Sequence, residues 1–185
     1  MSSKFEIHAL PLAGAYRLSR QPISDSRGLF ERLYCADELQ ALIGKPLAQI
    51  NRSLSTRAGT LRGMHFQYQP RAEVKLVSCL RGAIFDVIVD IRADSPTYLQ
   101  WHGEILSEQN HACMLVPQGF AHGFQTLVDD AETLYFVDEF FDPQHYAGLN
   151  PLDPALAIDW PLPVSEMSER DRTYPLLPDF QAVCL

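Results

Sequence analysis

The alternation of apolar and polar positions in the middle of the chain predicts a fold built from β-strands. Residues 83–91 (AIFDVIVDI) alternate with the period of two that a strand requires. One face of this strand would be wholly apolar, with Ala83, Phe85, Val87, Val89 and Ile91. The other face mixes apolar and acidic residues, namely Ile84, Asp86, Ile88 and Asp90. We therefore expect a sheet with one drier side.

Helical periodicity is convincing in one segment only, residues 35–43. Leu39, Leu42 and Ile43 recur there at helical spacing, and Gly44 supplies a stop. Short strands bounded by Gly, Pro, Asn or Asp are expected after it, at 47–54, 60–67, 75–80, 98–106, 111–116, 122–128 and 132–140. Many short strands with little helix indicate an all-β sandwich or barrel.

The chain changes character after Phe141, because seven of its 13 prolines follow that residue. Proline cannot donate a hydrogen bond to a β-ladder. The Pro-rich C-terminal segment is therefore expected to wrap over the barrel instead of extending it. No internal repeat or low-complexity linker is visible, so residues 1–185 are expected to form a single domain.

Composition narrows the possible partners. The formal net charge of −8, from 23 acidic and 15 basic residues, argues against nucleic-acid binding, which needs a basic face. Residues 1–10 lack the apolar centre of a signal peptide, and no run long enough to cross a bilayer is free of polar residues. We expect a cytoplasmic protein that does not bind membranes.

The four cysteines, Cys35, Cys79, Cys113 and Cys184, form no C-x-x-C pair. Neither a zinc knuckle nor a redox motif is visible, and we expect free thiols in a reducing compartment.

Candidate chemistry is concentrated in two motifs and one lysine. LRGMHFQ (61–67) contains Arg62 and His65, PQGFAHGF (117–124) contains His122, and Lys75 lies between them. A single histidine in a β-rich protein is more often structural than catalytic, so the argument depends on the combination. Cationic and acid–base groups at strand-like positions of an acidic chain predict a site that acts on an anionic small molecule.

The order of motifs along the chain resembles that of the dTDP-4-dehydrorhamnose 3,5-epimerase family. The matching motifs are LRGMHFQ (61–67), KLV (75–77), FDV (85–87), DIR (90–92), SPT (95–97), PQGFAHGF (117–124), LY (134–135) and SERD (168–171). The resemblance extends from about Arg27 to Leu177. It implies a cupin-like jelly-roll β-sandwich with one short N-terminal helix, usually a homodimer, that works without a metal or an organic cofactor. It also implies inversion of carbons beside the ketone of a nucleotide-linked 4-keto-6-deoxyhexose.

The resemblance assigns four catalytic residues. His65 matches the general base, and Asp171 matches the carboxylate that orients it. Lys75 matches the lysine near the developing enolate, and Tyr135 matches the acid that returns a proton from the opposite face. The implied substrate contacts are Arg27, Gln49, Asn51, Arg62, His122, Phe141 and Arg170.

These residue types also make chemical sense. A carbon-bound proton beside a ketone is weakly acidic, so a histidine can remove it only if a cation stabilises the oxyanion that forms. A neutral tyrosine hydroxyl is suited to donate on the other face near pH 7.

Structural roles remain open for Tyr135 and for three acidic residues, Asp171, Asp86 and Asp90. Tyr135 shares a strand face with Thr133 and Val137, which would also fit a half-buried core tyrosine. SERD (168–171) begins like a capping box and, without the family resemblance, indicates a surface loop. Asp86 and Asp90 are expected to pair with nearby bases or close turns, and we leave them outside the site.

Several positions depart from the family pattern near the expected substrate. Arg52 replaces a histidine in a strand expected to face the substrate, which would add permanent charge to the pocket. Arg32 stands where a glutamate is common, although Glu31 would fill the role if the strand were shifted by one residue. Tyr146 replaces another substrate-contacting glutamate.

The aromatic and basic positions change as well. Phe140-Phe141 replaces paired tyrosines, so that Phe141 would stack on the base without a hydroxyl contact. Arg170 replaces a lysine and is expected to retain its charge interaction with different geometry.

Three alternatives are kept. The enzyme could invert one carbon only, as a 3-epimerase or a 5-epimerase, or act on another dTDP-, CDP- or UDP-linked ketosugar. A metal-dependent cupin would need more ligands than His65 and His122 provide. A non-catalytic sugar-nucleotide-binding protein would keep the pocket without needing both a base and an acid.

Overall fold

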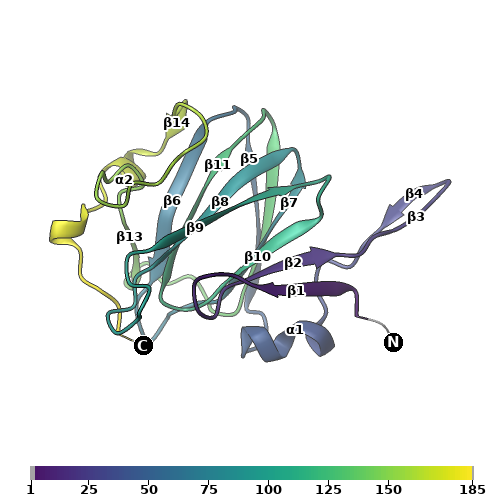
Figure 1. Cartoon of the computed structure of the whole chain (residues 1–185), viewed down its shortest axis with the longest axis horizontal. Helices are drawn as coiled ribbons and strands as arrows, with labels where there is room; N and C mark the ends of the chain where they lie inside the picture. Colours follow the sequence, from purple (N-terminus) through teal and green to yellow (C-terminus); the bar gives the residue numbers. More distant parts are fainter. Residues whose placement is uncertain (1–2, 185) are drawn as a thin grey trace.

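The computed structural model describes residues 3–184 and shows two facing β-sheets (Figure 1). The first sheet has the strand order β1 (Phe5–Ala9), β2 (Tyr16–Arg20), β10 (Ala112–Val116), β7 (Lys75–Arg81), β12 (Ala131–Val137) and β5 (Gln49–Ser55). The second has the order β13 (Tyr146–Gly148), β6 (Thr60–Gln67), β11 (Phe120–Thr126), β8 (Ala83–Asp90) and β9 (Trp101–Ser107), with β14 (Glu166–Met167) also paired to β6. This arrangement confirms the predicted all-β sandwich.

Smaller elements lie outside the two sheets. The hairpin of β3 (Ile23–Asp25) and β4 (Gly28–Phe30) projects away from the sandwich, and α1 (Ala36–Ile43) lies beneath the first sheet (Figure 1). The helix matches the prediction for 35–43. A second, single-turn helix, α2 (Glu169–Arg172), and a 3-10 helix, η1 (Leu177–Asp179), lie in the C-terminal segment and were not predicted.

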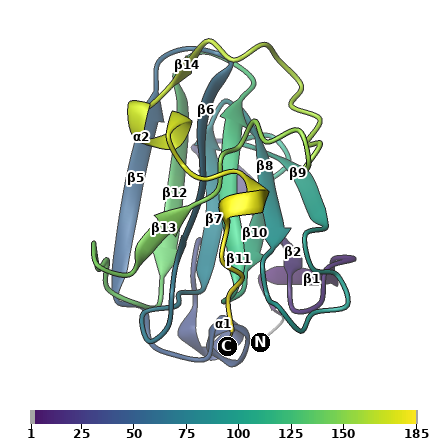
Figure 2. The ribbon, with the colours of Figure 1, turned by 90° about the vertical axis from the view of Figure 1, so that its left-hand side faces the viewer.

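The core has three layers of apolar contacts. Residues of both sheets, such as Val77, Ile88 and Met114, pack between the sheets. Leu39 and Ile43 of α1 pack on the outer side of the first sheet. The C-terminal segment covers the outer side of the second sheet (Figure 2). The strands β8 and β11 of the second sheet are therefore covered on both sides.

This burial corrects the expectation for the strand at 83–91. Ile84 and Ile88 of the mixed face lie in the core between the sheets, and Asp86 on that face has no exposed surface. The apolar face, with Val87 and Val89, is covered by the C-terminal segment. Neither side of this strand is solvated, because a segment distant in sequence supplies a third layer.

The C-terminal segment wraps over the second sheet as predicted, but it also extends that sheet. β13 pairs antiparallel with residues 65–67 at one end of β6, and β14 pairs in parallel with residues 60–61 at the other end. Both strands lie between prolines rather than on them, so their N–H groups remain free to pair. The prediction that this segment adds nothing to the sheet was wrong.

No helix within residues 3–184 is long and apolar enough to cross a membrane. All four cysteines are free thiols, as expected.

Candidate active site

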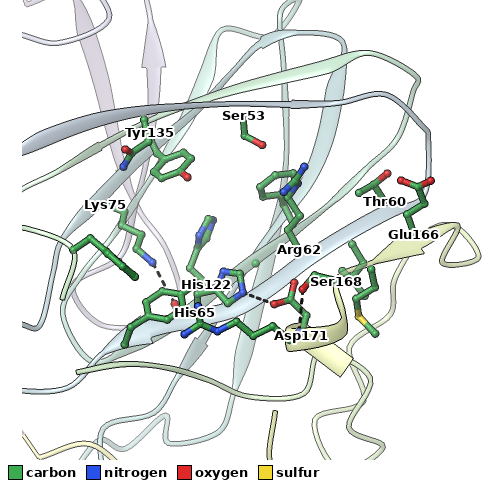
Figure 3. Close-up of a pocket in the computed structure, with 18 of the residues that line it drawn as sticks. Ser53, Thr60, Arg62, His65, Lys75, His122, Tyr135, Glu166, Ser168 and Asp171 are labelled. Carbon is green, nitrogen blue, oxygen red and sulfur yellow. Dashed lines mark hydrogen bonds and ion pairs between the residues drawn. The ribbon is translucent and has the colours of Figure 1, made fainter. Parts of the chain in front are cut away.

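A cavity of about 910 Å³ opens between the two sheets near β6 (Figure 3). The first sheet lines it through β5, β7 and β12, the second sheet through β6 and β11, and the C-terminal segment through β13 and α2. All four predicted catalytic residues lie in its wall.

His65 and Asp171 form a hydrogen-bonded pair at one wall of this cavity. Nε2 of His65 lies 2.8 Å from Oδ1 of Asp171, and the second carboxylate oxygen accepts a bond from the Gly63 N–H at 3.2 Å. Burial lowers the pKa of His65, against the opposing effect of the Asp171 carboxylate. A neutral, partly buried imidazole held by a carboxylate has the properties of a general base.

Local structure in the C-terminal segment places Asp171. Ser168 caps α2, its Oγ accepting a hydrogen bond from the Asp171 N–H at 3.0 Å. Burial alone would raise the pKa of Asp171, but bonds from His65, Gly63 and Ser168 hold it below its usual range. Asp171 is only 4% exposed, so the surface loop suggested by the SERD motif alone is wrong. The capping part of that motif does form.

Two glycines allow β6 and β11 to approach closely behind this pair. A Cβ on Gly63 would lie 2.5 Å from the Gly123 Cα, and Gly63 has a φ of +136° that favours glycine. Beyond this contact the register pairs His65 with His122. The close approach therefore brings the histidines of both sequence motifs to neighbouring positions.

His122 forms a second buried pair with Asp86. Nε2 of His122 lies 2.7 Å from Oδ1 of Asp86, which has no exposed surface. Burial raises the pKa of Asp86, and the charges of His122 and Lys75 oppose that effect. Asp86 pairs with a base, as predicted, and that base lines the cavity. Asp90 instead binds Arg92 and closes a turn, as predicted.

Lys75 enters the cavity from the first sheet. Its Nζ lies 2.9 Å from Oε1 of Glu73 and 3.3 Å from the His65 carbonyl oxygen, and the residue is only 8% exposed. Glu73 was not among the residues that the sequence analysis singled out. A screened cation beside His65 can stabilise an oxyanion at the cavity centre.

Tyr135 points into the cavity from β12, across from His65 on β6 (Figure 3). Burial raises the pKa of Tyr135, so its hydroxyl keeps its proton at neutral pH. Its ring also packs against the core between the sheets, which means that the structural and the functional interpretation both hold.

Most predicted substrate contacts also line the cavity. Gln49, Asn51, Arg62, His122, Phe141 and Arg170 are in its wall. Arg62 donates to Ser55 Oγ at 3.1 Å, and the Arg170 guanidinium lies 4.4 Å from the centre of the Tyr146 ring. Within residues 3–184 neither arginine pairs with a carboxylate, which leaves both cations available to an anionic ligand.

Arg27 does not join this group. It lies at the tip of the β3–β4 hairpin, where it pairs with Asp25 and is highly exposed. Arg27 therefore does not line the cavity that contains the other predicted site residues.

Two of the positions that depart from the family pattern, Arg52 and Arg32, lie outside the cavity. Arg52 does not add charge to the pocket, because it faces outward from β5 and pairs with Glu132 at 2.7 Å. Glu31 pairs with Arg20, and Arg32 pairs with Glu38; both pairs lie outside the cavity. Alternation along β5 points Gln49, Asn51 and Ser53 inward instead.

Tyr146 does line the cavity, as its position predicted. Its ring lies 5.1 Å from that of Phe141 and 5.4 Å from that of His65. An aromatic wall thus connects the expected nucleotide end with the base. Within the described part of the chain, no three His, Cys, Asp or Glu side chains are grouped so that they could hold a metal.

Comparisons with known proteins agree with this geometry. A family model described as dTDP-4-dehydrorhamnose 3,5-epimerase matches residues 9–179. A dTDP-4-dehydrorhamnose 3-epimerase from Streptomyces niveus is 39% identical over 173 residues, covering 92% of this chain and 83% of that protein.

Two crystal structures are similar over almost the whole chain. The dTDP-4-dehydrorhamnose 3,5-epimerase from Bacillus anthracis, with TDP and PPi bound, has a TM-score of 0.89 and 44% identity, covering 94% of this chain and 99% of that one. The dTDP-6-deoxy-D-glucose-3,5-epimerase from Legionella pneumophila, in complex with dTDP-4-keto-L-rhamnose, has a TM-score of 0.92 and 36% identity, covering 98% of each chain.

Proposed function

Because the chain belongs to the dTDP-4-dehydrorhamnose 3,5-epimerase family, we propose that it converts dTDP-4-dehydro-6-deoxy-D-glucose to dTDP-4-dehydro-L-rhamnose. The proposal rests on one observation above all. A partly buried histidine–carboxylate pair and a protonated tyrosine face each other across one cavity, with a lysine beside them. An inversion needs a base on one face of the substrate and an acid on the other.

In this mechanism His65 removes the proton from a carbon beside the ketone. The electron pair moves into an enolate, and Lys75 stabilises the negative charge on the former ketone oxygen. Tyr135 then donates its hydroxyl proton to the opposite face of the same carbon, and the ketone forms again. The Asp171 carboxylate stabilises the imidazolium formed in the first step, at a hydrogen-bond distance of 2.8 Å.

The nucleotide would extend toward the cavity end formed by Phe141, Tyr146 and Arg170. Phe141 is 51% exposed, so one ring face is free to stack on a base. Arg62 and Arg170, the unpaired cations described above, would bind the diphosphate. Because aromatic stacking tolerates different bases, CDP- and UDP-linked sugars should be assayed beside the dTDP-sugar.

The number of inverted carbons is part of the proposal. The relatives include both 3,5-epimerases and a 3-epimerase. The mechanism above uses one base, His65, and one acid, Tyr135, so inversion at a second carbon by the same pair requires the substrate ring to turn between steps. Inversion at carbon 3 alone is the alternative supported by the 3-epimerase relative.

Turnover can be separated from simple binding with one variant. His65→Ala should abolish product formation while the affinity for dTDP, measured by isothermal titration calorimetry, stays close to that of the wild type. His65→Asn offers a matched control that keeps a polar side chain. Binding without turnover in the wild-type protein, with any of the three nucleotide sugars, would support a sugar-nucleotide-binding protein instead.

We also propose that the protein is a homodimer in which each β3–β4 hairpin reaches the partner's cavity. The hairpin exposes large apolar side chains, with Ile23 55%, Leu29 57% and Phe30 69% exposed. Arg27 lies at its tip, although the family resemblance assigns it to the substrate. Contact with a second copy would explain both features.

Subunit mixing tests this arrangement. If Arg27 acts in the partner's cavity, a heterodimer of Arg27→Ala and His65→Ala subunits contains one site free of both changes. A random mixture should then recover roughly a quarter of wild-type activity. If Arg27 acts in its own subunit, every site carries one change and the mixture gains nothing.

A further inference from the structure

The His65 side chain has two aromatic neighbours besides its carboxylate partner. The Tyr146 ring lies 5.4 Å from the imidazole in a tilted arrangement, and the Tyr174 ring lies 5.8 Å away at an interplanar angle of 68°. Tyr146 lines the cavity, whereas Tyr174 is not part of the cavity wall. Tyr174 therefore approaches the imidazole from outside the cavity.

The sheet makes room for Tyr174 at one position. Gly148 of β13 pairs directly with His65 of β6, so a side chain at position 148 would project beside the imidazole. A Cβ at Gly148 would lie 2.5 Å from the Tyr174 Cε2 and 2.7 Å from the Met64 carbonyl oxygen. The ring of Tyr174 thus occupies the place that Gly148 leaves open opposite His65.

The backbone around Tyr174 is fixed to the same strand region. Asn150 donates its backbone N–H to the Pro175 carbonyl and its side-chain amide to the Arg172 carbonyl, both at 3.1 Å. α2, which carries Asp171, ends at Arg172, just before Tyr174. One short segment therefore supplies both the carboxylate and the aromatic ring that contact His65.

We propose that Tyr174 is a positioning residue for the reaction proposed above, restricting the orientation of the His65 imidazole and keeping water from its rear. The ring carbons, not the hydroxyl, do this. The hydroxyl is buried and makes no hydrogen bond that meets normal geometry within residues 3–184. Phenylalanine should therefore replace Tyr174 with little effect, whereas a smaller, non-aromatic side chain should not.

The expected chemical effect follows from the surroundings of the imidazole. Burial is the main reason that the pKa of His65 is lowered, so removing the Tyr174 ring admits water and raises it. The other charged and titratable groups that face His65 remain in the variant, namely Asp171, Lys75, His122, Tyr146 and Arg170. A change in the His65 pKa would therefore report the lost ring.

The test measures the base directly and needs no substrate. The His65 imidazole, assigned by comparison with His65→Asn, is titrated by NMR in wild type, Tyr174→Leu and Tyr174→Phe. We expect a higher pKa in Tyr174→Leu and a wild-type value in Tyr174→Phe. A His65 pKa within about 0.2 unit of wild type in Tyr174→Leu would overturn the proposal, whether or not the protein turns over a sugar.

Kinetics then distinguish positioning from general stability. For Tyr174→Leu we expect kcat to fall about 10-fold or more with KM and dTDP affinity little changed, because a slightly misplaced base reacts poorly. The acid limb of kcat/KM should move to higher pH, since the base must be neutral to act. A fall in activity that tracks a loss of folded protein, with an unmoved acid limb, would mean a merely structural role.

Gly148→Ala provides an independent route to the same displacement. Its Cβ should push the Tyr174 ring away and raise the His65 pKa as well. In the double variant with Tyr174→Leu the smaller side chain leaves space, so the two effects should not add. Additive pKa changes would contradict the placement of Tyr174 in the space beside Gly148.

Discussion

Replacing Asp171 with asparagine should disable the base while preserving the shape of the site. The two carboxylate oxygens accept one bond each, from Nε2–H of His65 at 2.8 Å and from the Gly63 N–H at 3.2 Å. Asparagine offers one acceptor and one donor, so it can satisfy only one of these partners. The side chain is buried, so water does not readily replace the missing bond.

Each orientation of the new amide harms the reaction. If the amide oxygen faces Gly63, the NH₂ group faces Nε2 of His65, and the imidazole proton must move to Nδ1, the nitrogen left free for the substrate. If the amide is turned over, its NH₂ group meets the Gly63 N–H. The lost charge-assisted bond alone is worth about 1.5–3 kcal/mol, or roughly 10- to 150-fold. With the wrong tautomer added, we expect kcat to fall about 10²- to 10⁴-fold.

The assay follows deuterium uptake from solvent into dTDP-4-dehydro-6-deoxy-D-glucose by NMR, with thermal unfolding as a check on folding. The pH profile gives a second result. Asp171 opposes the effect of burial on the pKa of His65, so Asp171→Asn should lower that pKa and move the acid limb of the remaining activity to lower pH. Unchanged kcat in folded Asp171→Asn would refute the role of this carboxylate.

The remaining predictions concern the oxyanion, the acid and the backbone contact behind the histidines. Lys75→Met should lower kcat about 10²- to 10³-fold without weakening dTDP binding, because oxyanion stabilisation is lost; unchanged exchange of substrate protons would contradict this. Tyr135→Phe should still exchange substrate protons with solvent but form little inverted product, and equal losses of both by NMR would contradict its role as the acid. Gly123→Ala should destabilise the fold by about 1–3 kcal/mol in urea unfolding, since its Cβ would lie 2.6 Å from the Met64 sulfur. An unchanged midpoint would show that β6 and β11 can separate there.

The sequence predicted the strands well where alternation was strong. β6 was expected at 60–67 and forms at Thr60–Gln67, and β8 was expected at 83–91 and forms at Ala83–Asp90. The exposure of the β8 faces was wrong, because the layer that covers Val87 and Val89 comes from the C-terminal segment. Local alternation identifies a strand but says nothing about what lies on either side of the sheet.

The same limit explains the errors within the site. Asp171 contacts His65 across 106 positions of sequence, and its four-residue motif contains no sign of that contact. Arg52 is the opposite case, because alternation from Asn51 already places its side chain on the other face. Arg27 could be matched by resemblance, but the sequence does not reveal that its hairpin projects away from the sandwich (Figure 1).

Proton exchange at the sugar carbons tests the central claim most directly. Purified protein is incubated in deuterium oxide with dTDP-4-dehydro-6-deoxy-D-glucose, and the signals of the protons on carbons 3 and 5 are followed by NMR. We predict that both protons exchange and that dTDP-4-dehydro-L-rhamnose accumulates. Exchange at carbon 3 alone would restrict the enzyme to one inversion. Retention of both protons with dTDP-, CDP- and UDP-linked ketosugars would contradict the proposed base–acid chemistry.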